Sequence, residues 1–358
     1  MKRLISSMTV MAALATASAV QAAGAWSKPA DTSKPVKVFI LMGQSNMVGL
    51  GKKAILETAV KEKKKYPYLV DSEGKWTVRQ DVRFVQFMQG KGLLKNEWMT
   101  ISGNTIGPEL GIGHKLGDAF DEPVMILKSC IGNRALGWDL LPPGSERFTV
   151  VKKDKTGAEK TYVYAGYKDK PESWVADPVK GKATEPPPWL DKKGKPINWY
   201  AGKNYDEDTA DAKKALADIG KYYPGAAGYE VVGFLFWQGE RDLGDPVHAE
   251  HYEKNLVRFI KSVRKDFDAP NAKFVLATLG EAKKGIGGTG EVILNAQLAV
   301  DGASGKHPEF KGNVATVYTH PMAQGGSGNG HYGGNAEVYM DVGEAMGKAM
   351  IELLQVKK

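Results

Sequence analysis

The chain has 358 residues, of which 42% are hydrophobic and 25% charged, a composition typical of a soluble globular protein with a sizeable core. Its single cysteine, Cys130, excludes an intramolecular disulfide, and we expect a buried, inert thiol there because it closes an apolar run. The formal net charge of +8 comes from scattered lysines, many of them beside acidic residues. Nucleic-acid binding is therefore not expected.

The first 22 residues, MKRLISSMTVMAALATASAVQA, combine a basic start, an apolar stretch and a small-residue end. This pattern is typical of a secretory signal peptide, with cleavage after Ala22. No cysteine lies directly after the apolar stretch, and no later stretch reaches the roughly 18 to 20 apolar residues of a membrane span. The sequence therefore predicts an exported protein without a membrane anchor, periplasmic or secreted, and leaves its oligomeric state open.

Apolar runs alternate with amphipathic stretches along the rest of the chain. The expected strands are residues 36–43, 83–89, 123–130, 229–238, 273–280 and 313–319. The expected helices are residues 107–119, 209–223, 247–267 and 336–355. Continuous apolar strands separated by helices favour an α/β fold, a three-layer sandwich with a central, mostly parallel sheet.

Residues 140–205 break this rhythm, because they are rich in proline, lysine, glycine and aromatic residues. A segment of this length without clear periodicity is typical of a functional insertion or a lid. We therefore expect a single domain over residues 23–358, with an irregular insertion at about 140–205.

The first expected strand leads into the sequence VFILMGQSNMVGLG, residues 38–51. Glycine, serine and asparagine are turn formers, so a tight turn is the simplest interpretation. The alternative is that Ser45 is a nucleophile, because ligands of parallel α/β sheets bind beyond the carboxyl ends of the strands. Ser45 would then need a base. The local pattern alone is weak, since position 47 is methionine and the Gly-x-Ser-x-Gly elbow is absent.

A second polar cluster follows the expected strand 229–238, in the sequence FLFWQGERDLGD. Gln238 can donate through its side-chain amide, and Glu240 or Asp242 can orient a histidine. The same side chains could instead cap the next helix or pair with Arg241.

A late histidine, His331, lies in the glycine-rich sequence GGSGNGHYGGNAEVY just before the last expected helix. Histidine is the usual general base at neutral pH, although a loop histidine can also be solvated or capping. We favour His331 over His320, which also follows an expected strand. The sequence contains no metal-ligand spacing, phosphate-binding loop or dinucleotide fingerprint with the required context.

Taken together, GQSNM, WQGERD and the late loop histidine resemble the SGNH/GDSL hydrolases. More narrowly, they are similar to the sialate O-acetylesterase and acetyl xylan esterase branch, which includes carbohydrate esterase family six. The stretches GPELGIGHKLG, ILKSCIGNRALGW and HYEKNLVRFIKSVRKDF fit the same branch. The resemblance spans roughly residues 36–355 and implies an SGNH, flavodoxin-like architecture.

The resemblance implies that Ser45 is the nucleophile and that His331 is the base. It assigns the oxyanion hole to the backbone N–H groups of Ser45 and Gly132 and to the side-chain amide of Gln238. The residues it implies for substrate binding are Gln44, Asn46, Asn133, Trp138 and Trp237.

The sequence departs from the family at the acid that orients the histidine. Many relatives carry Asp-x-x-His, but position 328 is glycine in this chain. Glu240 is therefore the expected acid, with Asp242 as the alternative.

The sequence thus predicts an exported carbohydrate O-acetylesterase that uses an acetyl-serine intermediate and needs no metal or cofactor. Its substrate would be an acetylated oligo- or polysaccharide of the xylan or sialate type. Aromatic residues of the insertion could stack on sugar rings or form a small core of their own. Two alternatives remain: a lipase, thioesterase or acyltransferase on the same fold, and a glycan-binding protein without catalysis.

Overall fold

The computed structural model describes residues 29–176, 185–323 and 330–356. The predicted signal peptide, residues 1–22, lies outside these ranges, and so does position 328. Within the ranges, no helix has both the length and the apolar character needed to cross a membrane.

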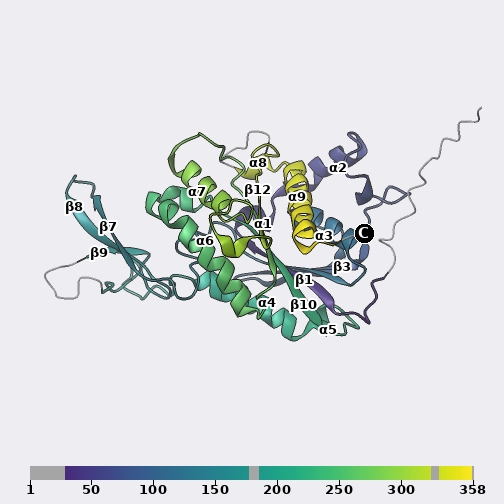
Figure 1. Ribbon diagram of the computed structural model, residues 1–358, viewed down its shortest axis with the longest axis horizontal. Coiled ribbons are helices and arrows are strands. Elements are labelled where there is room, and N and C mark those ends of the chain that lie inside the picture. The colour runs from purple at the N-terminus through teal and green to yellow at the C-terminus, as the bar shows by residue number, and fades with distance from the viewer. Residues whose placement is uncertain (1–28, 177–184, 324–329, 357–358) are drawn as a thin grey trace, which may run out of the picture.

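A seven-stranded sheet forms the centre of the molecule (Figure 1). Its strands are β1 (Val36–Gly43), β3 (Arg79–Met88), β4 (Gly92–Met99), β6 (Val124–Ser129), β10 (Tyr229–Trp237), β11 (Lys273–Ala277) and β12 (Val314–Val317). They follow the order β12-β11-β10-β1-β6-β3-β4, and every neighbouring pair is parallel except β3 and β4. The predicted α/β class with a mostly parallel sheet is therefore confirmed.

Helices cover both faces of this sheet (Figure 1). They are α1 (Ser45–Val48), α2 (Lys53–Lys61), α3 (Glu109–Ala119), α4 (Lys203–Ala217), α5 (Ile219–Tyr222), α6 (Pro246–Asp266), α7 (Gly288–Ala299), the short turn α8 (Gly330–Gly333) and α9 (Ala336–Leu354). One core lies between the sheet and α4, α6 and α7, and the other lies between the sheet and α2, α3 and α9.

The central strand β1 explains why its sequence is apolar without alternation. Val38 and Ile40 belong to one core, and Phe39 and Leu41 belong to the other. All four side chains are fully buried. Both faces of the strand are therefore removed from water, as in other parallel sheets.

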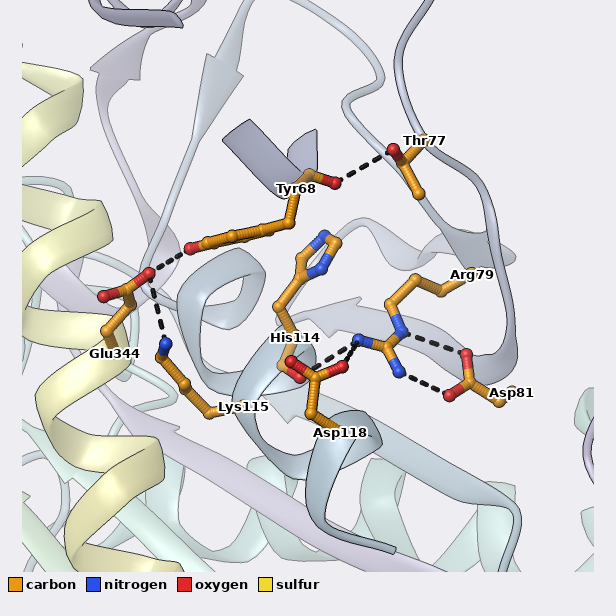
Figure 2. Close-up of polar contacts among 8 residues, drawn as sticks. All are labelled: Tyr68, Thr77, Arg79, Asp81, His114, Lys115, Asp118 and Glu344. Carbon is orange, nitrogen blue, oxygen red and sulfur yellow. Dashed lines mark hydrogen bonds and ion pairs between the residues drawn. The ribbon is translucent and has the colours of Figure 1, made fainter. Parts of the chain in front are cut away.

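A buried polar cluster ties the start of β3 to α3 (Figure 2). The guanidinium of Arg79 donates to the carboxylates of Asp81 and Asp118, each at 2.5 Å, and to the backbone carbonyl of His114 at 3.0 Å. Two carboxylates thus compensate a buried cation, which would be costly alone. Burial holds the pKa of His114 well below its usual range, so this histidine is neutral and structural.

The segment predicted as an irregular insertion carries regular structure. It contains a three-stranded antiparallel sheet of β7 (Phe148–Lys153), β8 (Glu159–Tyr164) and β9 (Ser173–Val175), which projects away from the main sheet in Figure 1. A small apolar cluster beside it consists of Ala135, Trp138, Leu141, Val163, Ala165, Trp174 and Ala201. For Trp138 and Trp174, the structure therefore favours a local core over an exposed stacking surface.

Candidate active site

At the end of strand β1, the backbone lies close against that of β10. Gly43, its last residue, has a φ of 143°, and a β-carbon there would lie 2.2 Å from the carbonyl oxygen of Trp237. Only glycine satisfies both constraints. After Gln44 the chain turns, and Ser45 becomes the first residue of α1. A small hydroxyl is thereby placed at the carboxyl end of a central strand, where α/β sheets bind ligands.

The two residues predicted as nucleophile and base lie in direct contact. His331 Nε2 is 2.8 Å from Ser45 Oγ, although the residues are 286 positions apart in the chain. This is the distance that a base needs to take the hydroxyl proton. The rival His320 is engaged elsewhere, because its Nδ1 lies 2.8 Å from the carbonyl oxygen of Gly280.

The turn that carries the histidine is conformationally strained. His331 has a φ of 52° and Tyr332 a φ of 58°, so two consecutive non-glycine residues are left-handed. Such conformations cost on the order of 1–3 kcal/mol each and persist only where the surroundings hold them.

A pocket of about 610 Å³ opens over the Ser45–His331 pair. Its lining residues are Gln44, Ser45, Gly132, Asn133, Glu240, Arg241, Gly244 and His331. The structure therefore brings six of the predicted site residues to one cavity. The predicted residues outside this lining are Asn46, Trp138, Trp237, Gln238 and Asp242.

The peptide of Gly132 comes close to the nucleophile. A β-carbon at position 132 would lie 3.3 Å from Ser45 Cβ, so glycine permits this approach. Within the described residues, no hydrogen bond engages the backbone N–H of Ser45 or of Gly132. Both N–H groups are thus available to an oxyanion beside Ser45.

Gln238 takes a different place from the one expected. It is fully buried, and its Nε2 donates to the carbonyl oxygen of Arg134 at 2.8 Å and to Asp242 Oδ2 at 2.6 Å. Both amide hydrogens are therefore engaged, as buried polar groups require. The structure does not bring Gln238 to the oxyanion position.

Glu240 also has partners that differ from the expectation. Its two carboxylate oxygens accept hydrogen bonds from the side-chain amides of Gln44 and Asn46, the neighbours of Ser45 on either side. In the described part of the chain, no hydrogen bond joins Glu240 to His331. Glu240 thus holds the nucleophile turn and does not orient the histidine.

The alternative acid, Asp242, is not at the histidine either. It is fully buried and accepts hydrogen bonds from the backbone N–H groups of Leu136 at 2.9 Å and Gly137 at 2.8 Å. Together with its bond to Gln238, these contacts anchor the loop that follows Gly132. Its carboxylate therefore holds the segment that follows the pocket residues Gly132 and Asn133.

Two of the aromatic residues predicted to bind substrate belong to the core. Trp237 is fully buried, and its Nε1 donates to the carbonyl oxygen of Thr278 at 3.0 Å. Trp138 is 7% exposed and packs edge-on against Trp189. Asn133 is exposed at the pocket, with a φ of 58°.

Glu240 is held in a setting that disfavours its charge. Burial first, and the neighbouring charge of Glu281 second, raise the pKa of Glu240 to about 8. Burial likewise raises the pKa of Glu281. The closeness of these two half-buried carboxyl groups was not expected from the sequence, because Glu281 lies 41 positions after Glu240.

The raised pKa of Glu240 predicts a pH dependence of stability. The folded protein binds this proton more tightly than the unfolded chain, whose glutamate pKa is about 4.5, so stability should fall as pH rises from about 4.5 to about 8. Glu240→Gln cannot ionise, and we expect thermal unfolding of this variant to depend less on pH across that window. Equal pH dependence in the wild type and the variant would contradict the assignment.

Sequence reasoning missed a buried lysine beneath the nucleophile. Lys128 Nζ donates to the carbonyl oxygens of Met47 at 3.2 Å and Val48 at 2.8 Å, at the end of α1. It also forms an ion pair with Glu109 at 2.6 Å. A signal was present in the sequence, because a lysine interrupts the apolar run PVMILKSC. In the same run, Cys130 is buried as expected, and burial raises the pKa of its thiol.

A family model described as "Carbohydrate esterase, sialic acid-specific acetylesterase" matches residues 191–352. This part of the chain is therefore similar to that family. The matched part of this esterase includes Glu240 and His331, whereas Ser45 precedes it. The match confirms the predicted enzyme class, an acetylesterase among the carbohydrate esterases.

Three solved structures are similar to this esterase. A protein from Arabidopsis thaliana, solved at 1.6 Å, shares 16% identity with a TM-score of 0.49, over 89% of this chain and 98% of that one. A carbohydrate acetylesterase from Xanthomonas citri shares 12% identity with a TM-score of 0.47, over 90% of this chain and 57% of that one. The structure of NanS shares 13% identity with a TM-score of 0.42, over 90% of this chain and 98% of that one. No curated protein matches the sequence.

Proposed function

We propose that this protein is an exported carbohydrate O-acetylesterase, a serine hydrolase that removes acetyl groups from acetylated oligo- or polysaccharides. The observation that carries the proposal is the 2.8 Å contact between His331 Nε2 and Ser45 Oγ at the floor of an open pocket. The family match over residues 191–352 supports the acetyl and carbohydrate parts of the proposal. Residues 1–22 support export.

In the proposed acylation step, Ser45 Oγ attacks the carbonyl carbon of the acetyl ester while His331 Nε2 takes the hydroxyl proton. Negative charge develops on the carbonyl oxygen, and the backbone N–H groups of Ser45 and Gly132 stabilise it. Losing one such donor typically costs about 10²- to 10³-fold in rate. The sugar hydroxyl then leaves with the proton that His331 returns.

In the proposed deacylation step, a water molecule takes the place of the sugar. His331 removes a proton from this water, which attacks the acetyl carbon of acetyl-Ser45. Acetate leaves, and the serine regains its proton from the histidine. The same pair of side chains thus serves both steps, and each step is balanced by proton transfer alone.

The test is acetate release by the purified protein from acetylated xylan, an O-acetylated sialoside and a small acetyl ester, beside the matching butyryl and octanoyl esters. We expect hydrolysis of acetyl esters, with rates falling as the acyl chain lengthens. Faster hydrolysis of the longer esters would favour a lipase or thioesterase. A folded protein that binds the acetylated glycans without releasing acetate would favour a glycan-binding function.

A further inference from the structure

Among the residues that the structure describes, no acid supports the histidine turn. Within the described ranges, no carboxylate is hydrogen-bonded to His331, because Glu240 is engaged by Gln44 and Asn46 and Asp242 by the 136–137 backbone. The left-handed backbone of His331 and Tyr332 also works against the observed geometry. Among the described residues, a group other than a carboxylate therefore has to keep the imidazole against Ser45.

Tyr332, the residue next to the histidine, is held from two sides. Its ring stacks on the indole of Trp237, with centroids 5.9 Å apart and planes at 16°. Its hydroxyl accepts a hydrogen bond from Asn46 Nδ2 at 3.0 Å. The side chain is only 8% exposed, although it follows a residue that lines the pocket.

The space around the Tyr332 ring is closed. A β-carbon at Gly280 would lie 2.7 Å from the Tyr332 hydroxyl and 2.6 Å from its ring, so only glycine leaves room for the side chain there. Glycine at position 280 therefore allows the Tyr332 side chain to pack directly against the backbone that follows β11.

Asn46 links this hydroxyl to the nucleophile. It follows Ser45 directly in α1, and its side-chain amide also donates to Glu240. One continuous set of hydrogen bonds therefore runs from the carboxylate of Glu240 through Asn46 to Tyr332. At one end, Glu240 accepts hydrogen bonds from the residues on either side of Ser45. The other end is Tyr332, the residue that follows His331.

We propose that Tyr332 is a positioning residue that fixes His331 against Ser45 through its stacking on Trp237 and its hydrogen bond with Asn46. In a catalytic triad, the acid orients the histidine by a hydrogen bond to its imidazole. Here Tyr332 would orient the histidine through the backbone, because it is the next residue in the chain. The inference rests on the proposed function only in taking Ser45 and His331 as a working pair. Tyr332 itself does not touch the substrate.

Tyr332→Phe tests this proposal, with Tyr339→Phe as the matched control. Tyr339 packs on the same indole and on Tyr332, yet no hydrogen bond joins its hydroxyl to Asn46, Glu240 or His331 in the described residues. The readout is the rate at which a fluorophosphonate labels Ser45. In that reaction the Oγ–P bond forms, the P–F bond breaks, fluoride leaves and the proton goes to His331, so any ester substrate is unnecessary.

We expect Tyr332→Phe to lower the labelling rate by about 10- to 100-fold, because a misplaced base loses the benefit of orientation. Tyr339→Phe should label at the wild-type rate. With acetyl esters, kcat should fall by the same factor for Tyr332→Phe and KM should stay unchanged. A purely structural role would lower the melting temperature and leave the labelling rate of the folded protein unchanged.

Two results would overturn the proposal. The first is labelling of folded Tyr332→Phe at the wild-type rate. The second is a wild-type protein that is folded and yet unlabelled, which would show that no activated serine exists to be positioned. Labelling without acetyl-ester hydrolysis would instead refute the proposed substrate and leave the Tyr332 comparison decisive.

Discussion

Replacing Ser45 with alanine should lower acetyl-ester hydrolysis by about 10⁶-fold, the size of loss seen when a serine hydrolase loses its nucleophile. The reason is that Ser45 Oγ is the atom His331 contacts at 2.8 Å, and it supplies the only bond by which the acetyl group would be held. The measurement is kcat/KM for a small acetyl ester. Stability should change little, since the removed hydroxyl lies at a pocket and not in the core.

The matched control is Ser129→Ala. Ser129 ends the neighbouring strand β6, and its buried Oγ has no hydrogen-bond partner in the described residues. The same substitution should therefore leave both activity and stability near the wild-type values. If folded Ser45→Ala kept more than a small fraction of the activity, the serine mechanism would be refuted.

Replacing Lys128 with methionine should have the largest effect on stability, about 3–5 kcal/mol, which is the usual cost of removing one partner of a buried ion pair. Lys128 is fully buried, and the substitution leaves the carboxylate of Glu109 uncompensated and two carbonyls of α1 without their donor. Activity should fall as well, because these carbonyls end the short helix that begins at Ser45. Urea unfolding and kcat for an acetyl ester measure the two effects.

A second variant separates the lost charge pair from the lost contact with α1. In Lys128→Met/Glu109→Gln the buried carboxylate is neutral, so part of the lost stability should return. The carbonyls of Met47 and Val48 remain without a donor, and kcat should therefore stay low. Full recovery of kcat in the double variant would show that Lys128 acts only through Glu109.

The sequence predicted the sheet well, because strands buried on both faces leave continuous apolar runs. The first of these, residues 36–43, coincides with β1. The antiparallel edge strand β4 was missed, since most of its residues are exposed or half-buried and its pattern is mixed. The helix α7 was also missed, because its apolar residues do not gather on one face.

The site was predictable at the level of chain position and not at the level of side-chain partners. Ser45 and His331 stand out because one ends a strand and the other precedes a long helix, and the topology brings such points together. Gln238 and Asp242 also follow a strand, yet both turn towards the loop around residues 134–137, roughly 100 positions earlier. No local sequence pattern predicts these orientations, because they depend on the buried backbone N–H groups of residues 136 and 137, which need acceptors.

The order of the strands also governs when catalysis can begin during folding. β1 is the first strand of the sheet in the sequence, yet it lies between β6 and β10. Its residue Val36 pairs with Tyr229, far later in the chain. The base His331 lies further along the chain still, 286 residues after the nucleophile Ser45. Contacts of such long range form slowly, because loop closure precedes any gain from them. On refolding, recovery of esterase activity should therefore lag behind recovery of the helical circular-dichroism signal. The rate at which activity returns then reports when the carboxyl-terminal segment docks onto the sheet.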